Sequence, residues 1–351
     1  MTALADTLAW LVGIPSVTGS EGRIATAVSE RLLPIWTLSG VQRFGNSVVV
    51  GQRTGRPLIS IYGHLDTVPE QDGNATLRVE KGRMFGLGTS DMKAGLAVMV
   101  HLLEDEGVRS GEYDVIGVFY DKEEGPAAEN GLEHVLEEAS WLAQSDIAIV
   151  MEPTDLKLEL GCNGTMNADV IFNGTASHSA RPWFGENAVT KSAKWLSKMH
   201  ALEPVSHIIS GLDYREVFTV TRAEGGIANN VVPSQFRLNL NYRFTPDMTA
   251  ADARTRLLDI ASEADEVIVG DSAPAGAVPE GNKHLLRLES LLGGERFPKQ
   301  GWTDVARLTA WGIPAVNYGP GDPGVAHQAG ESVVLQSLDV AYGVMRHFLG
   351  A

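Results

Sequence analysis

The chain has 351 residues, 44% of them hydrophobic, so it can bury a large core, and we expect two domains rather than one. Its 28 Lys and Arg against 44 Asp and Glu give a formal net charge of −16. This charge repels phosphate backbones and anionic lipid surfaces, and no basic run offsets it, so nucleic acid is not expected as a partner. No segment reaches the roughly 20 apolar residues of a membrane span. A single cysteine, Cys162, excludes an intrachain disulfide, and we expect a cytoplasmic protein without membrane contact.

Strands and helices alternate in the first half of the chain. The N-terminal segment has apolar residues at helical spacing and no basic flank, which predicts an ordinary first helix. Short, nearly continuous apolar runs predict strands covered on both faces, at 57–63, 113–120 and 146–152. Helical spacing predicts helices between these strands, at 91–106 and 130–143. The alternation indicates an α/β sheet.

The pattern restarts at about residue 165. Strands are predicted at 165–174, 216–225, 230–245 and 266–270, with helices at 186–202 and 249–264. Two helices over an antiparallel sheet would close as a small two-layer α+β domain. After a stretch rich in Pro, Gly and Ala, the first pattern resumes with helices at 283–292 and 304–311, a strand at 313–319 and a C-terminal helix. We therefore predict one α/β domain in two segments, 1–164 and 275–351, with an inserted domain at 165–274.

Polar residues follow the predicted strands of the first half or precede the helix between two of them. The set comprises His64, Asp66, Asp91, Glu123, Glu124 and Glu152. In open α/β sheets, ligands bind beyond the carboxyl ends of the strands, where these side chains would converge if the strands are parallel. Carboxylates that lie so close together repel one another unless cations are present, so the convergence predicts bound metal. Imidazole and carboxylate ligands suit zinc, with manganese or cobalt as possible substitutes.

Spacing within this set indicates individual roles. Residues two apart on an extended chain share a face, so Asp66 can orient the imidazole of His64. Taken alone, this short motif is equally well explained by polar residues that cap a turn. Glu123 and Glu124 are adjacent and point in opposite directions, which predicts two different roles. Asp91 can also cap the following helix, which is compatible with metal binding. It stands where a nucleotide-binding fingerprint would need its third glycine, so we reject that reading of "GLGTSD".

Five motifs, in this order, resemble the dimetal zinc aminoacylase and carboxypeptidase family: "YGHLDTVP", "GLGTSDMKAG", "DKEEGP", "MEPT" and "AHQAGE". The resemblance spans essentially the whole chain. It implies a zinc-peptidase-like catalytic domain, an inserted lid and dimerisation domain, and hence a homodimer. It also implies two Zn²⁺ per chain, held by His64 and Glu152, by Glu124 and His327, and by Asp91, which bridges both ions. Glu123 is then the general base, which accounts for the paired glutamates.

The same resemblance assigns residues of the inserted domain. His178, in "TASHSARPW", matches a histidine that reaches across the dimer in this family to stabilise the tetrahedral oxyanion. Asn230, Arg243 and Arg181 match substrate-binding positions, and a solvated strand end is the alternative explanation for them. A small anionic substrate would need such local positive charge in a chain of net charge −16.

Three stretches bear on the substrate: "SHSARPWFGENA", "KQGWTDVARL" and "NYGPGDPGVAHQAGE". They are similar to the actinobacterial desuccinylase branch of the family, which implies zinc-dependent hydrolysis of N-succinyl-LL-2,6-diaminopimelate to succinate and LL-2,6-diaminopimelate. Around Trp302 and Thr303 the chain departs from the proteobacterial pattern, so no substrate contact is carried over there. Deacetylation of N-acetylornithine or of another N-acyl amino acid is the alternative. A non-catalytic metal-binding subunit is a third reading, but no expected ligand or base is missing.

Overall fold

The computed structural model describes residues 2–71, 73 and 76–351. Backbone contacts divide the chain into two compact units. The first unit comprises Met1–Gly161, Ala277–Phe297 and Thr303–Ala351, and the second comprises Cys162–Gly276 and Pro298–Trp302. The domain boundaries expected from the sequence at 164/165 and 274/275 stay a prediction. The short segment Pro298–Trp302 was expected in the C-terminal segment of the first domain, but its contacts group it with the second unit.

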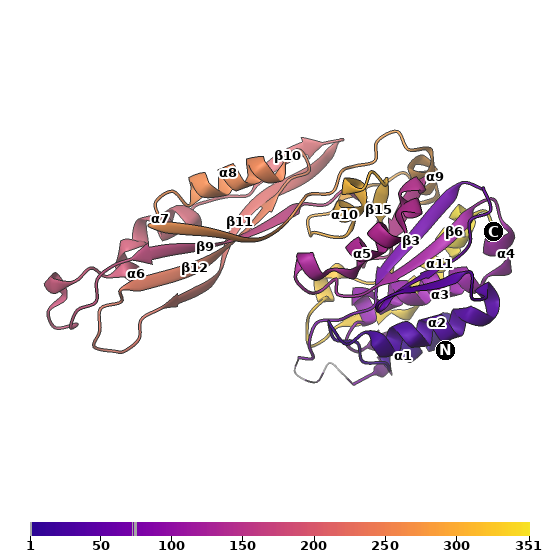
Figure 1. The fold of residues 1–351 in the computed structure, drawn as a ribbon, viewed down its shortest axis with the longest axis horizontal. Helices are drawn as coiled ribbons and strands as arrows, with labels where there is room; N and C mark the ends of the chain where they lie inside the picture. Colours follow the sequence, from indigo (N-terminus) through magenta and orange to yellow (C-terminus); the bar gives the residue numbers. More distant parts are fainter. Residues whose placement is uncertain (1, 72, 74–75) are drawn as a thin grey trace. The chain divides into compact units, whose positions relative to one another are not determined.

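The first unit is built on an eight-stranded sheet in the order β1-β2-β6-β3-β7-β15-β8-β14 (Figure 1). Its four central strands are parallel: β6 (Asp114–Tyr120), β3 (Leu58–His64), β7 (Ile147–Val150) and β15 (Ala315–Asn317). Every residue of these strands is buried, as expected where helices cover both faces of a sheet. The strands predicted at 57–63, 113–120, 146–152 and 313–319 are therefore confirmed. The outer strands are β1 (Val41–Phe44), β2 (Ser47–Val50), β8 (Glu159–Leu160) and β14 (Phe297–Pro298).

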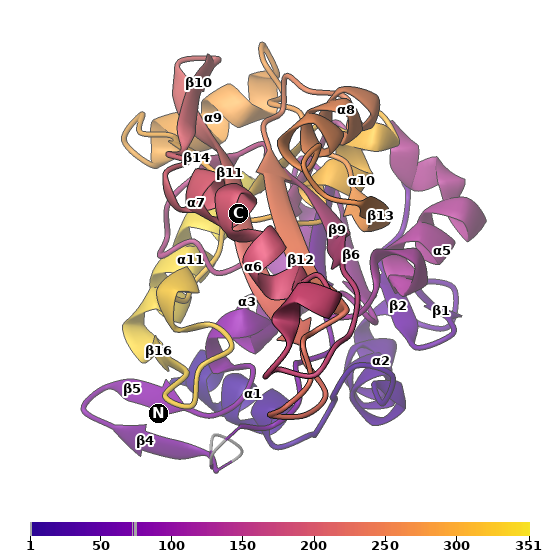
Figure 2. The same ribbon diagram turned by 90° about the vertical axis from the view of Figure 1, so that its left-hand side faces the viewer.

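Helices pack on both faces of this sheet (Figures 1 and 2). One face is covered by α1 (Ala3–Val12), α2 (Gly22–Trp36), α3 (Ala94–Glu104), α9 (Lys283–Leu291) and α11 (Leu335–Phe348). The other face carries α5 (Gly131–Glu138) and α10 (Val305–Ala310), while α4 (Glu106–Ser110) follows α3. A further sheet, β16-β5-β4, joins Ser332–Val334, Arg83–Phe85 and Arg78–Glu80 (Figure 2). The elements not predicted from the sequence are α2, α4, the outer strands of the large sheet and the three strands of the small sheet.

The second unit is a five-stranded antiparallel sheet with helices on one face (Figure 1). The strand order β10-β11-β12-β9-β13 joins Val205–Ile209, Leu212–Gly225, Gln235–Phe244, Gly164–Asn173 and Glu266–Ala273. The helices are α6 (Ala188–Lys191), α7 (Ala193–His200) and α8 (Ala250–Ile260). Trp195 of α7 and Leu257 of α8 are buried in one core with Phe172 and Tyr242 of the sheet. The predicted two-layer α+β architecture is confirmed.

Two predicted elements of the second unit differ from the structure. The strand expected at 230–245 begins only at Gln235, because Pro233 has no N–H to donate and a central strand must pair on both sides. The helix expected at 186–202 is divided into α6 and α7 around Ser192. Strand β10, with mostly exposed residues, has no continuous apolar run and was not predicted. Within the described part of the chain, no helix has both the length and the apolar character needed to cross a bilayer.

Candidate active site

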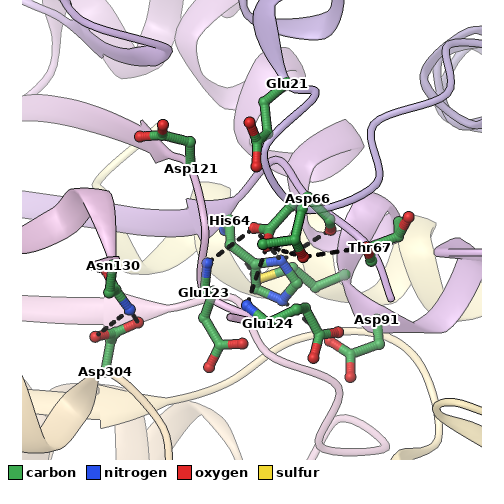
Figure 3. A network of polar contacts seen from close by, with 12 residues as sticks. Glu21, His64, Asp66, Thr67, Asp91, Asp121, Glu123, Glu124, Asn130 and Asp304 are labelled. Carbon is green, nitrogen blue, oxygen red and sulfur yellow. Dashed lines mark hydrogen bonds and ion pairs between the residues drawn. The ribbon is translucent and has the colours of Figure 1, made fainter. Parts of the chain in front are cut away.

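The candidate residues of the first unit gather where the central parallel strands end (Figure 3). His64 is the last residue of β3 and pairs in register with Tyr120, the last residue of β6. The chain then continues from β6 to Glu123 and Glu124. One ligand atom from each of His64, Asp91 and Glu124 lies within 4.8 Å of the others. The parallel arrangement therefore brings three of the expected metal ligands together.

Asp91 lies between two histidines. Its Oδ1 is 3.1 Å from Nε2 of His64, and its Oδ2 is 3.3 Å from Nε2 of His327. The same His327 nitrogen is 2.9 Å from Oε1 of Glu124. Ligand atoms around a tetrahedral zinc with bonds of about 2.1 Å are about 3.4 Å apart, close to these spacings. The donor set thus has the chemistry and spacing of metal ligands, and Asp91 offers one carboxylate oxygen to each histidine.

The carboxylates create a strongly negative field around both imidazoles. Hydrogen bonds to Asp91 and Glu124 raise the pKa of His327 to about 10. Burial lowers the pKa of His64, but its bonds to Asp66 and Asp91 outweigh burial and raise the pKa well above its usual range. Such a field favours positive charge, whether from protons or from bound cations.

Glu123 and Glu124 point in different directions (Figure 3). The Glu124 carboxylate extends towards Asp91, and the Glu123 carboxylate extends away from it. Burial raises the pKa of Glu123 well above its usual range, and the negative charges of Glu152, Asp304 and Glu124 raise it further, against the lowering effect of His64. Glu123 can therefore hold a proton at a pH where an exposed glutamate cannot.

Asp66 supports this glutamate pair. Its Oδ1 and Oδ2 accept hydrogen bonds from the backbone N–H groups of Glu123 and Glu124, each at 3.0 Å, and Oδ2 also accepts the Thr18 hydroxyl at 2.9 Å. Nδ1 of His64 is 3.1 Å from the Asp66 carbonyl oxygen but 3.5 Å from its carboxylate. The short contact that orients His64 is therefore made by the backbone of Asp66, while its carboxylate fixes the two glutamates.

Glu331 is a site residue that the sequence analysis left without a role. It is 2% exposed, and its carboxylate accepts the backbone N–H groups of Gly88, Ser90 and Asp91 at 3.1, 2.8 and 3.0 Å. It lies four positions after His327, so it ties the segment carrying one candidate ligand to the segment carrying another. Glu331 is the last residue of the motif "AHQAGE", and its place in this motif was the only indication of its role in the sequence.

Two further carboxylates adjoin the site. Asp304, which is fully buried, accepts two bonds from Nδ2 of Asn130, at 2.9 and 3.2 Å, and one from Nε of Arg307 at 3.0 Å (Figure 3). Glu152 follows β7, is 6% exposed and, like Asp304, contributes negative charge at Glu123.

The capping role considered for Asp91 is not the observed one, because the N-cap residue of α3 is Lys93.

The candidates of the second unit lie in different surroundings. His178, Arg181 and Asn230 are exposed. Nδ1 of His178 accepts the Ala180 N–H at 3.1 Å, and the carbonyl of Asn230 accepts the N–H of Ser179 at 2.9 Å, so His178 and Asn230 lie on adjoining turns. Arg243 of β12 is half-buried; burial lowers its pKa, and its Nε donates to Oδ1 of Asn241 at 3.2 Å.

Comparisons with known proteins agree with this geometry. The model of peptidase family M20/M25/M40 matches residues 60–351. A Mycobacterium tuberculosis protein named as the succinyl-diaminopimelate desuccinylase DapE is 39% identical over 343 residues, which is 97% of this chain and 96% of the relative. The succinyl-diaminopimelate desuccinylase of Corynebacterium glutamicum is 38% identical over 352 residues, with 97% and 94% covered.

A solved structure supports the fold independently. The aminopeptidase PepT of Bacillus cereus superposes with a TM-score of 0.79 at 18% identity, over 99% of this chain and 97% of that one. The predicted fold class is thereby confirmed. With a family model that matches most of its length and relatives near 40% identity, the chain belongs to peptidase family M20/M25/M40.

Proposed function

We propose that this chain is a metal-dependent amidohydrolase that cleaves N-succinyl-LL-2,6-diaminopimelate into succinate and LL-2,6-diaminopimelate. The placement of Asp91 between His64 and His327, beside Glu124, carries the reaction class. The substrate is proposed from the full-length similarity to proteins named as desuccinylases of that compound.

The metal centre would hold two divalent ions. His64 and Glu152 would bind one, Glu124 and His327 the other, and Asp91 both. Zinc suits this set of imidazole and carboxylate ligands, with cobalt or manganese as substitutes. Bound there, the ions would polarise the scissile carbonyl and make a water molecule acidic enough to attack at neutral pH.

Glu123 would move the proton in this reaction. A raised pKa suits a group that must accept a proton from the attacking water and then release it to the departing amine. The amide C–N bond breaks, the carbonyl carbon gains the water oxygen, and the amine leaves with the proton held by Glu123. Asp66 would keep Glu123 in place through the backbone bond described above.

The second unit would supply the groups that bind the substrate. We assign His178 to the oxyanion that develops on the carbonyl oxygen, and Arg243, Asn230 and Arg181 to the negative charges of the substrate. Because His178 is exposed, it has room to serve a site in a second chain, and we propose a homodimer. The single buried cysteine, Cys162, suits a reducing cytoplasm, where we place the protein.

The decisive experiment compares three substrates in parallel: N-succinyl-LL-2,6-diaminopimelate, N-acetylornithine and a dipeptide. Purified, zinc-loaded protein is assayed for amine release, with the Glu123→Gln variant as the control for contaminating hydrolases. We expect kcat/KM for the succinylated substrate to exceed that for the others by at least roughly 100-fold, because a site built for charged groups rejects analogues that lack them. Equal or reversed values would contradict the proposed substrate.

A further inference from the structure

The segment 125–129, which directly follows the paired glutamates, has little packing to hold it in place. None of its residues is buried, and Pro126, Ala128 and Glu129 are exposed. Its regular structure is a single 3₁₀ turn, Ala127–Glu129. A displacement of about 1 Å at a catalytic group can cost a large part of the rate, so a base next to such a segment must be fixed by other means. Hydrogen bonds at the two ends of the segment provide them.

The bonds at the downstream end are made by the first turn of α10. Asp304 is the N-cap residue of this helix, and its buried carboxylate accepts both bonds from Nδ2 of Asn130 (Figure 3). Asn130 is 4% exposed and is itself the N-cap residue of α5, where its Oδ1 accepts the N–H of Leu132 at 2.9 Å. The side chain of Asn130 therefore joins the end of the segment to Asp304.

Arg307 adds a bond to the segment itself. Its Nη2 donates to the carbonyl oxygen of Ala127 at 3.0 Å, and its Nε donates to Oδ1 of Asp304, also at 3.0 Å. Its Nη1 donates to Oε2 of Glu133 on α5 at 2.5 Å. The Arg307 side chain is 13% exposed, and hydrogen bonds shielded from water are electrostatically stronger than exposed ones. One guanidinium thus connects α10, α5 and the segment after the glutamates.

Stability alone is a poor explanation for this buried ion pair. Removing two charges from water costs about as much as their attraction returns, so an apolar pair of similar volume could serve the fold equally well. An apolar pair could not supply direction, whereas a hydrogen bond restricts both distance and angle. The arrangement therefore indicates that the pair serves to fix the position of the segment.

We propose that Asp304 and Arg307 are positioning residues for the amidohydrolase reaction. Through Asn130 and Ala127 they fix the segment that follows the glutamates, and so hold Glu123 in the geometry needed for proton transfer. Asp66 fixes the same stretch from its other end, through the backbone N–H groups of the two glutamates. The inference rests on the proposed function, because the role belongs to that reaction, and it requires no contact between the pair and the substrate.

The test compares Asp304→Asn with the double variant Asp304→Asn/Asn130→Asp, using the substrate that the parent protein cleaves fastest. The single variant leaves one acceptor oxygen for two donors, Asn130 and Arg307. Per folded, metal-loaded chain, kcat should fall at least about tenfold and KM should change less than about threefold, because a displaced base affects the chemical step more than binding. The double variant exchanges the amide and the carboxylate, and each can still make the bonds of the other. It should restore kcat to within about threefold of the parent.

Asp114→Asn is the matched control. Asp114 is also a fully buried aspartate that accepts Nε of an arginine, Arg56, at 3.0 Å. It is the first residue of β6, at the strand end away from the glutamates. Its loss should lower the melting temperature but leave kcat per folded, metal-loaded chain unchanged.

Hydrogen–deuterium exchange gives a readout that does not depend on activity. Exchange of the backbone N–H groups of 125–131 should be at least about tenfold faster in Asp304→Asn than in the parent protein, and unchanged in Asp114→Asn. If Asp304→Asn does not fold, Arg307→Lys keeps the charge but loses the fork that reaches Ala127, and it carries the same expectations.

Four results would overturn the inference in an active parent protein. They are an unchanged kcat with a lower melting temperature, a change in KM alone, metal loss with an unchanged kcat per loaded chain, and a double variant that recovers neither kcat nor slow exchange. An equal fall of kcat in Asp114→Asn would likewise show that the effect is not specific to the segment. A parent protein that cleaves none of the three substrates would instead overturn the proposed function, and with it this role.

Discussion

Most candidate residues of the first unit are buried or partly buried, and most of those of the second are exposed, with exposed His327 and half-buried Arg243 as the exceptions. In the first unit, His64 is 1% exposed and Asp66 is fully buried, and each has bonded neighbours in its own unit. In the second unit, His178, Arg181 and Asn230 are exposed, and the bonds recorded for them join adjoining turns. Residues held by packing and hydrogen bonds are preorganised, and exposed residues have fewer such constraints. The proposed metal centre can therefore be tested within the first unit, and the proposed substrate contacts together with the proposed homodimer.

The largest effect, on turnover, is expected when the two adjacent glutamates are substituted one at a time. Glu123→Gln keeps the shape but removes proton acceptance, so turnover should fall by about 10² to 10⁴ while metal content stays near two ions per chain. Glu124→Gln should instead lower the metal content, because an amide is a weaker ligand than a carboxylate. Steady-state kinetics and elemental analysis of both variants measure the difference. The opposite pattern would mean that the two roles are exchanged.

A second large effect would show whether the second unit serves a neighbouring chain. His178→Ala should be nearly inactive but should melt like the parent protein, because the side chain is exposed. Mixed with Glu123→Ala under subunit exchange, it should recover about a quarter of the parent activity, since half the dimers are mixed and each has one intact site.

The controls for this mixing experiment use other positions of the same protein. His200→Ala, at an exposed position of α7 in the same unit, should remain active alone. A tagged chain confirms that subunits exchange. If the activity of the mixture stays at the level of the separate variants, His178 acts in the site of its own chain. The site would then not need a second chain.

Metal removal should have an intermediate effect, confined to the first unit. Chelation leaves the carboxylates around Asp91 without cations, and a ligand that binds only the folded state stabilises it by about 2.7 kcal/mol at 100 times its dissociation constant. We expect a melting temperature lower by roughly 5 °C, restored by zinc. The Glu124→Gln variant should show a smaller shift on chelation. An unchanged melting curve would contradict the convergence of these residues on metal.

The smallest effect concerns Glu331, which links two ligand-bearing segments of the first unit. Glu331→Gln keeps one acceptor oxygen but loses the charge, and bonds to charged groups contribute roughly 1.5 to 3 kcal/mol each. We expect turnover to fall about tenfold and metal to bind more weakly, with KM little changed, since Glu331 bonds to the Asp91 segment and is buried. Glu289→Gln, on a helix of the same unit, is the matched control. A change in KM alone would show that Glu331 does not act through Asp91.

Local patterns were sufficient for much of the fold. Strands β3, β6 and β7 are buried along their whole length, and burial on both faces requires the continuous apolar runs from which they were predicted. Strand β10 is mostly exposed and leaves no such run, so the same reasoning missed it. The break at Ser192 is a single residue between α6 and α7, and sequence periodicity does not locate helix ends to within one or two residues.

The sequence by itself determined which chemical groups stand at the strand ends, because motif spacing is a property of neighbouring residues. It could not determine which atoms meet. Glu331 and Asp91 are 240 positions apart along the chain, and their bond exists only because the fold closes that distance. Asp66 shows the same limit at short range: spacing placed it beside His64, but the path of the chain after β6 directs its carboxylate to the backbone of Glu123 and Glu124. Side-chain identity is local, whereas hydrogen-bond partners depend on the whole chain path, so only the tertiary structure decided them.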